Sequence, residues 1–309
     1  MADPKIKVLY IAGYGRSGST LLDVLFGQFP GFVSTGELGN AWGLGPGYSP
    51  LCGCGQPVND CSFWKEVIEK TFDSPDEIED LYRMREDTEN KVSTLKAILP
   101  IRSGHLKRTL EEYSKLLLKL YRAIQEVSNA QFIVDSTKRP SYGKILGNMP
   151  GIELSVLHLV RDSRAVAYSW TRRRLRPEIH GSDQYAPTRG SLRSSAYWSL
   201  ANVFAESLRR ISPRYTLLRY EDFVAAPREE LNKLCRWLGV PEAPLDFLNG
   251  DQPVANQNHT IHGNPMRLQQ GGIQVRADTE WISKMSRPSR SIVTALTWPL
   301  LMRYGYPLK

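Results

Sequence analysis

Long apolar runs are missing from this sequence of 309 residues. The longest ones, LLLKLY near residue 116 and SIVTALTWPLLM near residue 291, are shorter than the roughly 20 residues that a membrane-spanning helix needs. Near the N-terminus, two lysines precede an apolar run of only five residues, which does not fit a secretory signal peptide. We therefore expect no membrane span and a cytoplasmic protein.

Cysteine is scarce, because the chain has only four. Cys52, Cys54 and Cys61 lie close together, and Cys235 is far from them. A zinc site prefers four ligands in paired C-x-x-C spacing, and this C-x-C-x6-C pattern has no fourth ligand beside it. We therefore expect no metal. The three cysteines then belong to a small glycine-rich loop. A cytosolic context favours free thiols in this loop, and closure by one disulfide bridge is the alternative.

Internal repeats, low-complexity stretches and linkers are also missing, so residues 1–309 are predicted to form a single domain. β-branched and aromatic runs predict strands, helical patterns separate them, and a helical insertion is expected at about 63–128. Alternating strands and helices predict an α/β fold of three layers, with a central parallel sheet and helices on both faces. The predicted strands are KVLYIAG (7–13), QFIVD (131–135), IELSVLHLV (152–160) and RYTLLRY (214–220).

The stretch GYGRSGST, residues 13–20, lies between the first predicted strand and a helical pattern. It is nearly the phosphate-binding loop G-x-x-x-x-G-K-[ST], but Ser19 stands where the lysine belongs. The loop has a cation elsewhere, at Arg16. Its backbone N–H groups, its hydroxyls and the following helix N-terminus predict that it binds an oxyanion, as in a P-loop-type fold.

Polar residues also follow the other three predicted strands, in DSTKRP, RDSRAV and EDF. Ligands of such sheets bind beyond the carboxyl ends of the strands. A nucleotide-dependent P-loop kinase is one alternative, and Asp135 ends a strand as its magnesium-binding aspartate would. The missing lysine argues against it.

The net charge of +8 is unevenly distributed. Eight arginines lie between Arg161 and Arg193 against three acidic residues, which suggests an anionic partner, although a solvated loop is the plain alternative. No aromatic interleaving or reading motif accompanies the charge, so nucleic acid is not expected. Nothing in the sequence predicts an oligomeric state.

Three motifs in this order, GRSGSTLL, LVRDSRAVAYSW and LLRYEDF, resemble the sulfotransferases that use 3'-phosphoadenosine-5'-phosphosulfate (PAPS). The arginine in the loop is similar to that of the bacterial, carbohydrate and tyrosylprotein branches. The resemblance implies in-line transfer of a sulfuryl group from PAPS to a hydroxyl of a small-molecule or carbohydrate acceptor, an alcohol or phenol. It implies release of 3'-phosphoadenosine 5'-phosphate (PAP) and no required metal. A protein that only binds the nucleotide is a further alternative.

The resemblance also implies the donor contacts. The loop would hold the 5'-phosphosulfate with Arg16 near the bridging oxygen, and Arg161 and Ser169 would hold the 3'-phosphate. Arg161 could instead pair with Asp162 or Asp222, and Ser169 could bond within its own helix. The implied contacts in full are Gly15, Arg16, Ser17, Gly18, Ser19, Thr20, Arg161 and Ser169.

Two residues are candidates for catalysis beside Arg16. Glu37 resembles the catalytic glutamate of the tyrosylprotein branch, but Ser34-x-x-Glu37 is also a capping-box pattern. Lys138 follows a predicted strand and would face the sulfate, unless it is an ordinary exposed lysine. Asp135 could orient it or serve as the base.

The segment NHTIHGNPMR is similar to a pattern of bacterial members of the family. The similarity implies that Arg267 closes over the donor and that His259 holds the turn by a backbone hydrogen bond. Three long loops, at 40–62, 171–193 and 250–280, are interpreted as coverings of the site.

The other distinctive side chains have plainer interpretations. His158 lies within a predicted strand and is expected to be a satisfied core residue. Tyr220 and its two acidic neighbours are expected to brace the loop. Three tryptophans could stack on adenine or a sugar, but we expect core positions for them: Trp170, Trp198 and Trp281.

Overall fold

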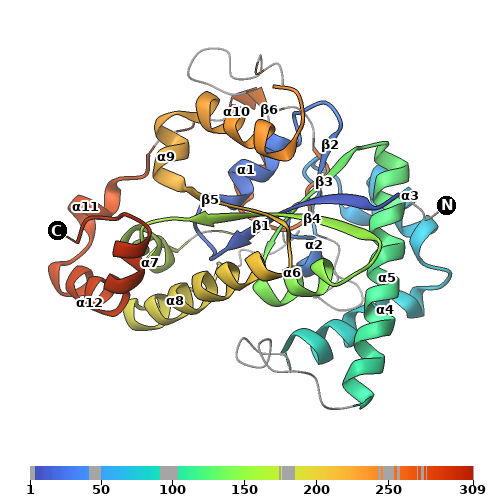
Figure 1. The fold of residues 1–309 in the computed structure, drawn as a ribbon, viewed down its shortest axis with the longest axis horizontal. Coiled ribbons are helices and arrows are strands. Elements are labelled where there is room, and N and C mark those ends of the chain that lie inside the picture. The colour runs from blue at the N-terminus through green and yellow to red at the C-terminus, as the bar shows by residue number, and fades with distance from the viewer. Residues whose placement is uncertain are drawn as a thin grey trace.

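The centre of the protein is a parallel sheet of five strands in the order β2-β3-β1-β4-β5, seen in the computed structural model of Figure 1. The structure describes residues 4–41, 50–90, 104–173, 175, 185–242, 245, 254–255, 258–269, 271–272, 275 and 277–308. The strands are β1 (Ile6–Gly13), β2 (Phe32–Ser34), β3 (Phe132–Lys138), β4 (Ile152–Val160) and β5 (Arg214–Arg219).

The four predicted strands are confirmed as β1, β3, β4 and β5, whereas the edge strand β2 was not predicted. Three residues are too short a run to show the alternation by which a strand is recognised in sequence. Pairing with β3 decides the conformation of β2, with Val33 opposite Ile133.

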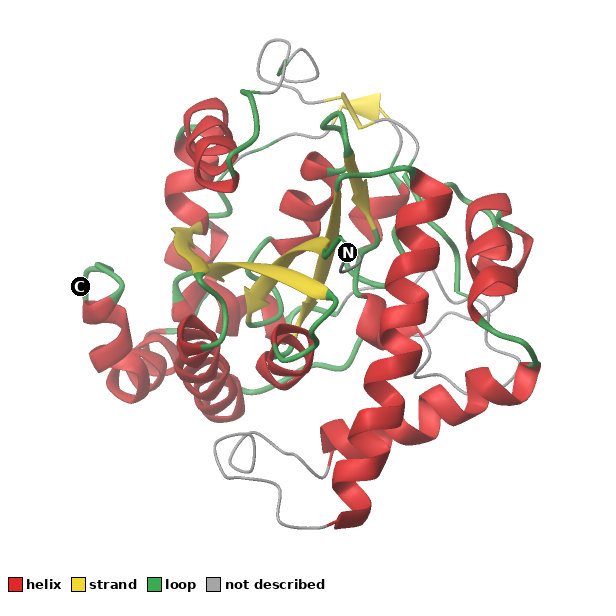
Figure 2. Ribbon diagram, turned by 45° about the vertical axis from the view of Figure 1, so that its right-hand side comes forward, coloured by secondary structure: helices red, strands yellow, loops and turns green. Residues whose placement is uncertain are grey.

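Helices cover both faces of the sheet, which confirms the three-layer α/β fold (Figure 2). Side chains of β1 alternate between the two cores: Val8 and Tyr10 enter one, and Leu9 and Ile11 enter the other. The first core includes α5 (Gly104–Ser128), α6 (Pro140–Gly147) and α8 (Ser191–Ser207), and the second includes α1 (Ser19–Phe26), α9 (Tyr220–Ala225) and α10 (Pro227–Leu238).

The region expected as a helical insertion is helical where the structure describes it. Its elements are α3 (Ser62–Thr71), α4 (Pro75–Arg85), the π-helical turn η2 (Glu86–Asn90) and α5. Residues 91–103 lie outside the described part. These helices pack against the β2 and β3 side of the sheet, at the right in Figure 1.

Short elements complete the described chain. They are α2 (Leu38–Ala41), η1 (Val58–Asp60), α7 (Ser163–Thr171), η3 (Leu208–Arg210), β6 (Val254–Ala255), η5 (Pro265–Leu268), β7 (Gly271–Gly272), α11 (Glu280–Lys284) and α12 (Arg287–Arg303). Among the described residues, no helix combines the length and the apolar character that crossing a bilayer requires.

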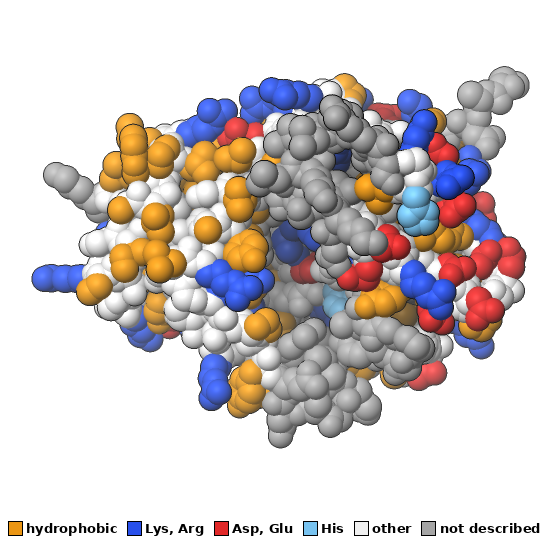
Figure 3. Space-filling view, turned by 90° about the horizontal axis from the view of Figure 1, so that it is seen from below, with side chains coloured by type: hydrophobic (Ala, Val, Ile, Leu, Met, Phe, Trp, Pro, Cys, Tyr) orange, Lys and Arg blue, Asp and Glu red, His pale blue; other side chains and the backbone are white. Residues whose placement is uncertain are grey.

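Exposed apolar side chains gather over α8 and α12, on the left of the face shown in Figure 3. Leu192 and Val203 of α8 and Leu296 and Met302 of α12 belong to this surface. None of these four residues lines the cavity described below.

The register of the sheet brings the carboxyl ends of three strands to the same edge. Gly13 at the end of β1 is opposite Leu159 of β4, and Ala12 is opposite Lys138 of β3. The residues that follow these strands therefore meet at one place, beyond the sheet.

Candidate active site

A cavity of about 610 Å³ lies beyond this edge of the sheet. The residues that line it come from many segments, the first in the loop after β1 and the last at Asp278. Most of the predicted site residues are among these lining residues. Those are Gly15, Arg16, Gly18, Ser19, Thr20, Glu37, Lys138, Arg161 and Ser169.

The loop between β1 and α1 has the backbone conformation of an anion-binding turn. Arg16 and Gly18 have positive φ angles of 72° and 94°, a backbone conformation that occurs in anion-binding nests of N–H groups. A Cβ atom at Gly18 would lie 2.6 Å from Cδ2 of Tyr220, so that position requires glycine. Tyr220 therefore braces the loop, as the sequence predicted.

The loop hydroxyls differ in their surroundings. Ser17 is buried, and its Oγ atom has no hydrogen-bond partner among the described residues. Thr20 accepts a hydrogen bond through Oγ1 from the backbone N–H of Asn264, at 3.1 Å. Thr20 thus joins the loop to the segment that follows β6, while the Ser17 hydroxyl keeps its hydrogen-bonding capacity.

Trp170 of α7 lies in the cavity wall beside the loop. The guanidinium carbon of Arg16 is 4.9 Å from the centroid of its ring, and that of Arg189 is 4.1 Å away. Trp170 is partly buried against a core cluster and also lines the cavity, so the core position expected for it holds only in part. Trp198 is a core residue, 1% exposed, and donates a hydrogen bond to the backbone carbonyl of Arg161.

Arg161 follows β4 and lines the cavity in contact with the loop. Its Nη1 donates to the Arg16 carbonyl at 3.0 Å, its Nη2 is 3.1 Å from Oδ2 of Asp278, and its guanidinium lies over the ring of Tyr220. Neither predicted alternative partner holds it. Asp162 pairs with Arg164 at 2.6 Å, and Asp222 lies 3.7 Å from Arg219.

Glu37 and Lys138 form an ion pair inside the cavity, and neither is an ordinary surface residue. Asn40 donates to the other oxygen of Glu37 at 2.6 Å. Ser34 donates instead to Asp23, at 2.5 Å, so the capping-box alternative for Glu37 does not describe the observed contacts. Burial would raise the pKa of Glu37, but the charge and hydrogen bond of Lys138, with His262 and Asn40, outweigh it and lower that pKa.

Backbone strain is concentrated at this cavity. In the described chain, four residues other than glycine have positive φ, and three of them line the cavity: Arg16 at 72°, Lys138 at 71° and His262 at 57°. Such conformations cost free energy and tend to occur where side chains are held for function. The fold thus directs one basic side chain toward the cavity from each of three segments.

Asp135 is buried inside the fold and does not line this cavity. Its carboxylate accepts hydrogen bonds from the Thr137 backbone at 2.7 Å and from the hydroxyl of Tyr121 at 2.5 Å, and it is fully buried. This geometry leaves Asp135 unsuited to the roles of magnesium ligand, base or partner of Lys138.

Arg267 is the predicted donor residue that the structure places elsewhere. Its side chain is 1% exposed and donates to the carbonyls of Thr260, at 2.8 Å, and Leu51, at 2.6 Å. The expected closure over the donor is therefore corrected: Arg267 joins two loops behind the cavity wall. The predicted role of Arg267 was wrong because the sequence pattern does not show which side of the turn faces the sheet.

The histidines of the sequence analysis fall into two groups. His158 is a core residue, as predicted, with Nδ1 2.7 Å from the Tyr215 hydroxyl and Nε2 2.8 Å from Oδ1 of Asn202. Burial lowers the pKa of His158 to about 4. His259 was expected to bond the backbone, but its imidazole lies beside two cysteine sulfurs instead.

The arginines of the basic segment at 161–193 also lie in different surroundings. Arg161 lines the cavity, whereas Arg164 is buried against Asp162 and Arg172 pairs with Glu280. Arg174 and residues 176–184, which include Arg176, lie outside the described residues, as do residues 42–49 and parts of 250–280. All three predicted coverings contribute to the cavity lining, with Asn40 from the first, Leu175, Ala186 and Pro187 from the second, and residues 262–266 and Asp278 from the third.

Sequence reasoning missed several polar lining residues: Asn40, Arg85, His262, Asn264 and Asp278. His262 and Asn264 do lie in the segment singled out as similar to a bacterial pattern, so that pattern indicated the right segment but the wrong residue. No local signal identifies Asp278, since only its contact with Arg161, 117 residues away, brings it to the site.

The sequence matches the model of a family described as the sulfotransferase family over residues 66–244. No curated protein matches the sequence. A solved sulfotransferase domain from the curacin biosynthetic pathway is 18% identical, with a TM-score of 0.51, and the match covers 99% of this chain and 100% of that one. The fold is therefore shared with that domain.

Two more solved structures were matched. A sulfotransferase from Alicyclobacillus acidocaldarius is 14% identical, with a TM-score of 0.39 and 96% of each chain covered. A sulfotransferase from Mycobacterium avium is 10% identical, with a TM-score of 0.48, covering 99% of this chain and 78% of that one.

Proposed function

Because the chain belongs to the sulfotransferase family, we propose that it transfers a sulfuryl group from PAPS to a hydroxyl of a small-molecule or carbohydrate acceptor and releases PAP. The observation that carries the proposal is the convergence of Arg16, Lys138 and Arg161 with the carboxylate of Glu37 in a single cavity. These three cations fit a donor with several negative charges. The carboxylate fits the removal of one proton.

The residues present fit such a donor at both of its ends. At the loop, the positive φ angles of Arg16 and Gly18 favour a nest of N–H groups, and the buried Ser17 hydroxyl can give a further hydrogen bond. Arg161 and Ser169 line the same cavity and suit a second anionic group. Trp170 offers an apolar ring for the base of a nucleotide.

PAPS would supply a sulfuryl group bonded to a phosphate that is a good leaving group. Arg16 is the residue of the loop that can stabilise negative charge as it develops on that phosphate. Its guanidinium is held against Trp170, so little reorganisation is needed during the reaction. Lys138 enters from β3 and supplies a second positive charge to the same cavity.

Glu37 is the base in this proposal. A lowered pKa keeps its carboxylate ionised at neutral pH, which a base requires, but weakens it as a proton acceptor. An anion in the cavity competes with Glu37 for the ammonium of Lys138. When Lys138 turns toward that anion, the burial of Glu37 remains and raises its pKa, so the carboxylate becomes a stronger base once donor is bound.

The acceptor would approach from the side of α2 and α4. Asn40 and Arg85 line the cavity there, and Arg85 belongs to the region predicted as a helical insertion. Polar side chains at this side suit an acceptor that carries several hydroxyl groups. The single-domain organisation and the cytoplasmic location of the enzyme remain predictions.

Calorimetry with PAP and an assay with labelled PAPS test the proposal. We expect PAP to bind one site per chain, and Arg161→Met together with Ser169→Ala to abolish that binding. With an extract of natural hydroxyl compounds, we expect a sulfated product by mass spectrometry. Arg16→Ala should lower kcat about 100-fold or more, as loss of a comparable oxyanion donor does.

Two results would overturn the proposal. One is an absence of PAP binding by the folded wild-type protein, or binding that the paired change at Arg161 and Ser169 leaves intact. The other is phosphoryl transfer from ATP with magnesium, which would indicate the kinase. A protein that binds PAP but sulfates none of the extract would be a nucleotide-binding protein only.

A further inference from the structure

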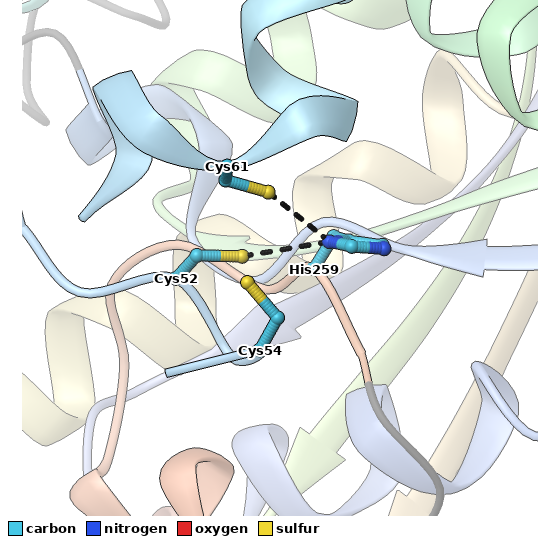
Figure 4. A group of neighbouring side chains, drawn as sticks. All are labelled: Cys52, Cys54, Cys61 and His259. Atoms are coloured by element: carbon cyan, nitrogen blue, oxygen red, sulfur yellow. Dashed lines mark hydrogen bonds between the residues drawn. The ribbon is translucent and has the colours of Figure 1, made fainter. Parts of the chain in front are cut away.

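Four side chains from three separate segments meet outside the cavity, at Cys52, Cys54, Cys61 and His259 (Figure 4). Their sulfur atoms and one imidazole nitrogen all lie within 4.8 Å of one another. Nδ1 of His259 is 3.6 Å from the sulfur of Cys52 and 3.3 Å from that of Cys61. None of the four residues lines the cavity.

These spacings match the edges of a zinc coordination tetrahedron. Zn–S bonds of about 2.3 Å and Zn–N bonds of about 2.0–2.1 Å at tetrahedral angles separate sulfur from nitrogen by about 3.6 Å. The two separations from Nδ1 are close to this value. Sulfur and imidazole nitrogen are also the ligand types that zinc prefers, and the buried Cys52 and Cys61 with the half-buried Cys54 and His259 form a closed set.

Backbone hydrogen bonds and one ring contact position these side chains. Cys52 and Cys54 lie in a tight turn closed by hydrogen bonds from Gly55 N to Cys52 O at 2.8 Å and from Cys52 N to Gln56 O at 2.7 Å. Cys61 directly precedes α3. The ring of Phe63 stacks on the imidazole of His259, with centroids 4.7 Å apart and planes 14° apart.

We propose that Cys52, Cys54, Cys61 and His259 bind one structural Zn²⁺ ion. This corrects the expectation that the cysteine cluster lacks a fourth ligand, because the fourth ligand comes from 198 residues beyond Cys61. The cysteines are free thiols in the structure, so no disulfide competes for these sulfurs. On binding, three thiols lose their protons to solvent, and the neutral imidazole donates its Nδ1 lone pair.

The ion would join the loop at 52–61 to the segment around His259, which leads into the cavity wall at His262. Gly53 donates to Thr260 O at 2.9 Å, and Trp64 donates through Nε1 to His259 O at 2.7 Å, so the loops already touch. Beyond Thr260 the chain passes Ile261, which accepts a hydrogen bond from Glu37 N, and reaches His262 in the cavity wall. Zinc would therefore stabilise the segment on which Glu37 depends.

Metal content is the first test. We expect mass spectrometry of the tag-free wild-type protein, made in zinc-supplemented medium, to find about one zinc ion per chain. Replacement of zinc by Co²⁺ should give the visible absorption of a tetrahedral site with thiolate ligands. Less than about 0.1 zinc per chain with no such cobalt spectrum would overturn the proposal.

Cys61→Ser and His259→Gln identify the ligands, with Cys235→Ala as the matched control. Cys235 is buried in α10, far from the cluster, so its loss removes a thiol without removing a ligand. We expect the first two variants to lose at least tenfold in zinc affinity and the control to keep it. Full zinc content in both ligand variants would refute the assignment.

Chelation tests the structural role without any variant. A strong chelator should lower the melting temperature of the wild-type protein and of Cys235→Ala, and added Zn²⁺ should restore it. A melting temperature insensitive to chelator, in protein shown to have lost its zinc, would contradict that role. The measurement of zinc content uses neither a sulfuryl donor nor an acceptor. Its result therefore tests the zinc site independently of the proposed sulfotransferase activity.

Discussion

The ammonium group of Lys138 and the carboxylate of Glu37 form an ion pair in the cavity, although 101 residues separate them in the sequence. Lys138 reaches Glu37 because its backbone turns with a positive φ at the end of β3. Both side chains are largely buried, so the pair is shielded from solvent and its charge matters more than at a surface. The first two predictions concern the two members of this pair.

Glu37→Gln should lower kcat by about 100-fold or more, the usual contribution of a positioned base, because an amide cannot accept the acceptor's proton. PAP affinity, measured by calorimetry, should stay the same or become tighter, since a negative charge leaves the cavity. Glu126→Gln, on the exposed side of α5, is the matched control. Near-normal kcat in Glu37→Gln would assign the base elsewhere.

Lys138→Met should move the acid limb of the kcat/KM profile to higher pH. The charge and hydrogen bond of Lys138 oppose burial and lower the pKa of Glu37, so without them burial raises that pKa. As the pH falls, the Glu37 carboxylate is then protonated at a higher pH than in the wild-type enzyme. Lys115→Met, on the exposed surface of α5, should leave the profile unchanged. An acid limb that stays in place, or moves down, would contradict the coupling.

Arg161 and Asp278 should affect PAP binding in opposite directions. Arg161→Met removes a charged hydrogen-bond donor, which typically costs about 1.5–3 kcal/mol, and should weaken binding at least tenfold. Asp278→Asn removes the carboxylate 3.1 Å from Arg161 and should tighten binding, because the anion no longer competes with it. Calorimetry at fixed salt measures both. Weaker binding in Asp278→Asn would show that Asp278 orients Arg161 instead.

His158 should make the protein less stable in mild acid. Its folded-state pKa of about 4 lies below its usual value of 6.5, so the unfolded chain binds the proton first as the pH falls. From pH 6.5 to about 4, this group should remove up to about 3 kcal/mol of unfolding free energy. Urea titrations of His158→Gln should show a smaller loss over that range. His105→Gln, exposed in α5, should behave as wild type.

The central strands and the phosphate-binding loop were predictable because their signals are local. Runs such as KVLYIAG indicate a buried strand within a few residues. Gly18 indicates a tight turn, and in the structure the ring of Tyr220 leaves no room for a side chain at that position. The edge strand β2 was not predictable, since three residues show no period and its pairing with β3 decides it.

Within the site, the resemblance to the PAPS-dependent sulfotransferases indicated Arg16, Glu37, Lys138, Arg161 and Ser169, all of which line the cavity. The resemblance failed at Arg267, which is buried, and the sequence did not show that Trp170 lines the cavity.

The composition and order of short motifs settled the fold class and the position of the loop, because strand alternation and glycine turns depend on neighbours in the chain. Which distant residues contact one another was decided only by the folded chain. Asp278 beside Arg161, and His259 beside Cys61, are contacts across more than 100 residues. No local pattern encodes such pairs, since they form only when packing of the two cores brings distant loops to the same edge of the sheet.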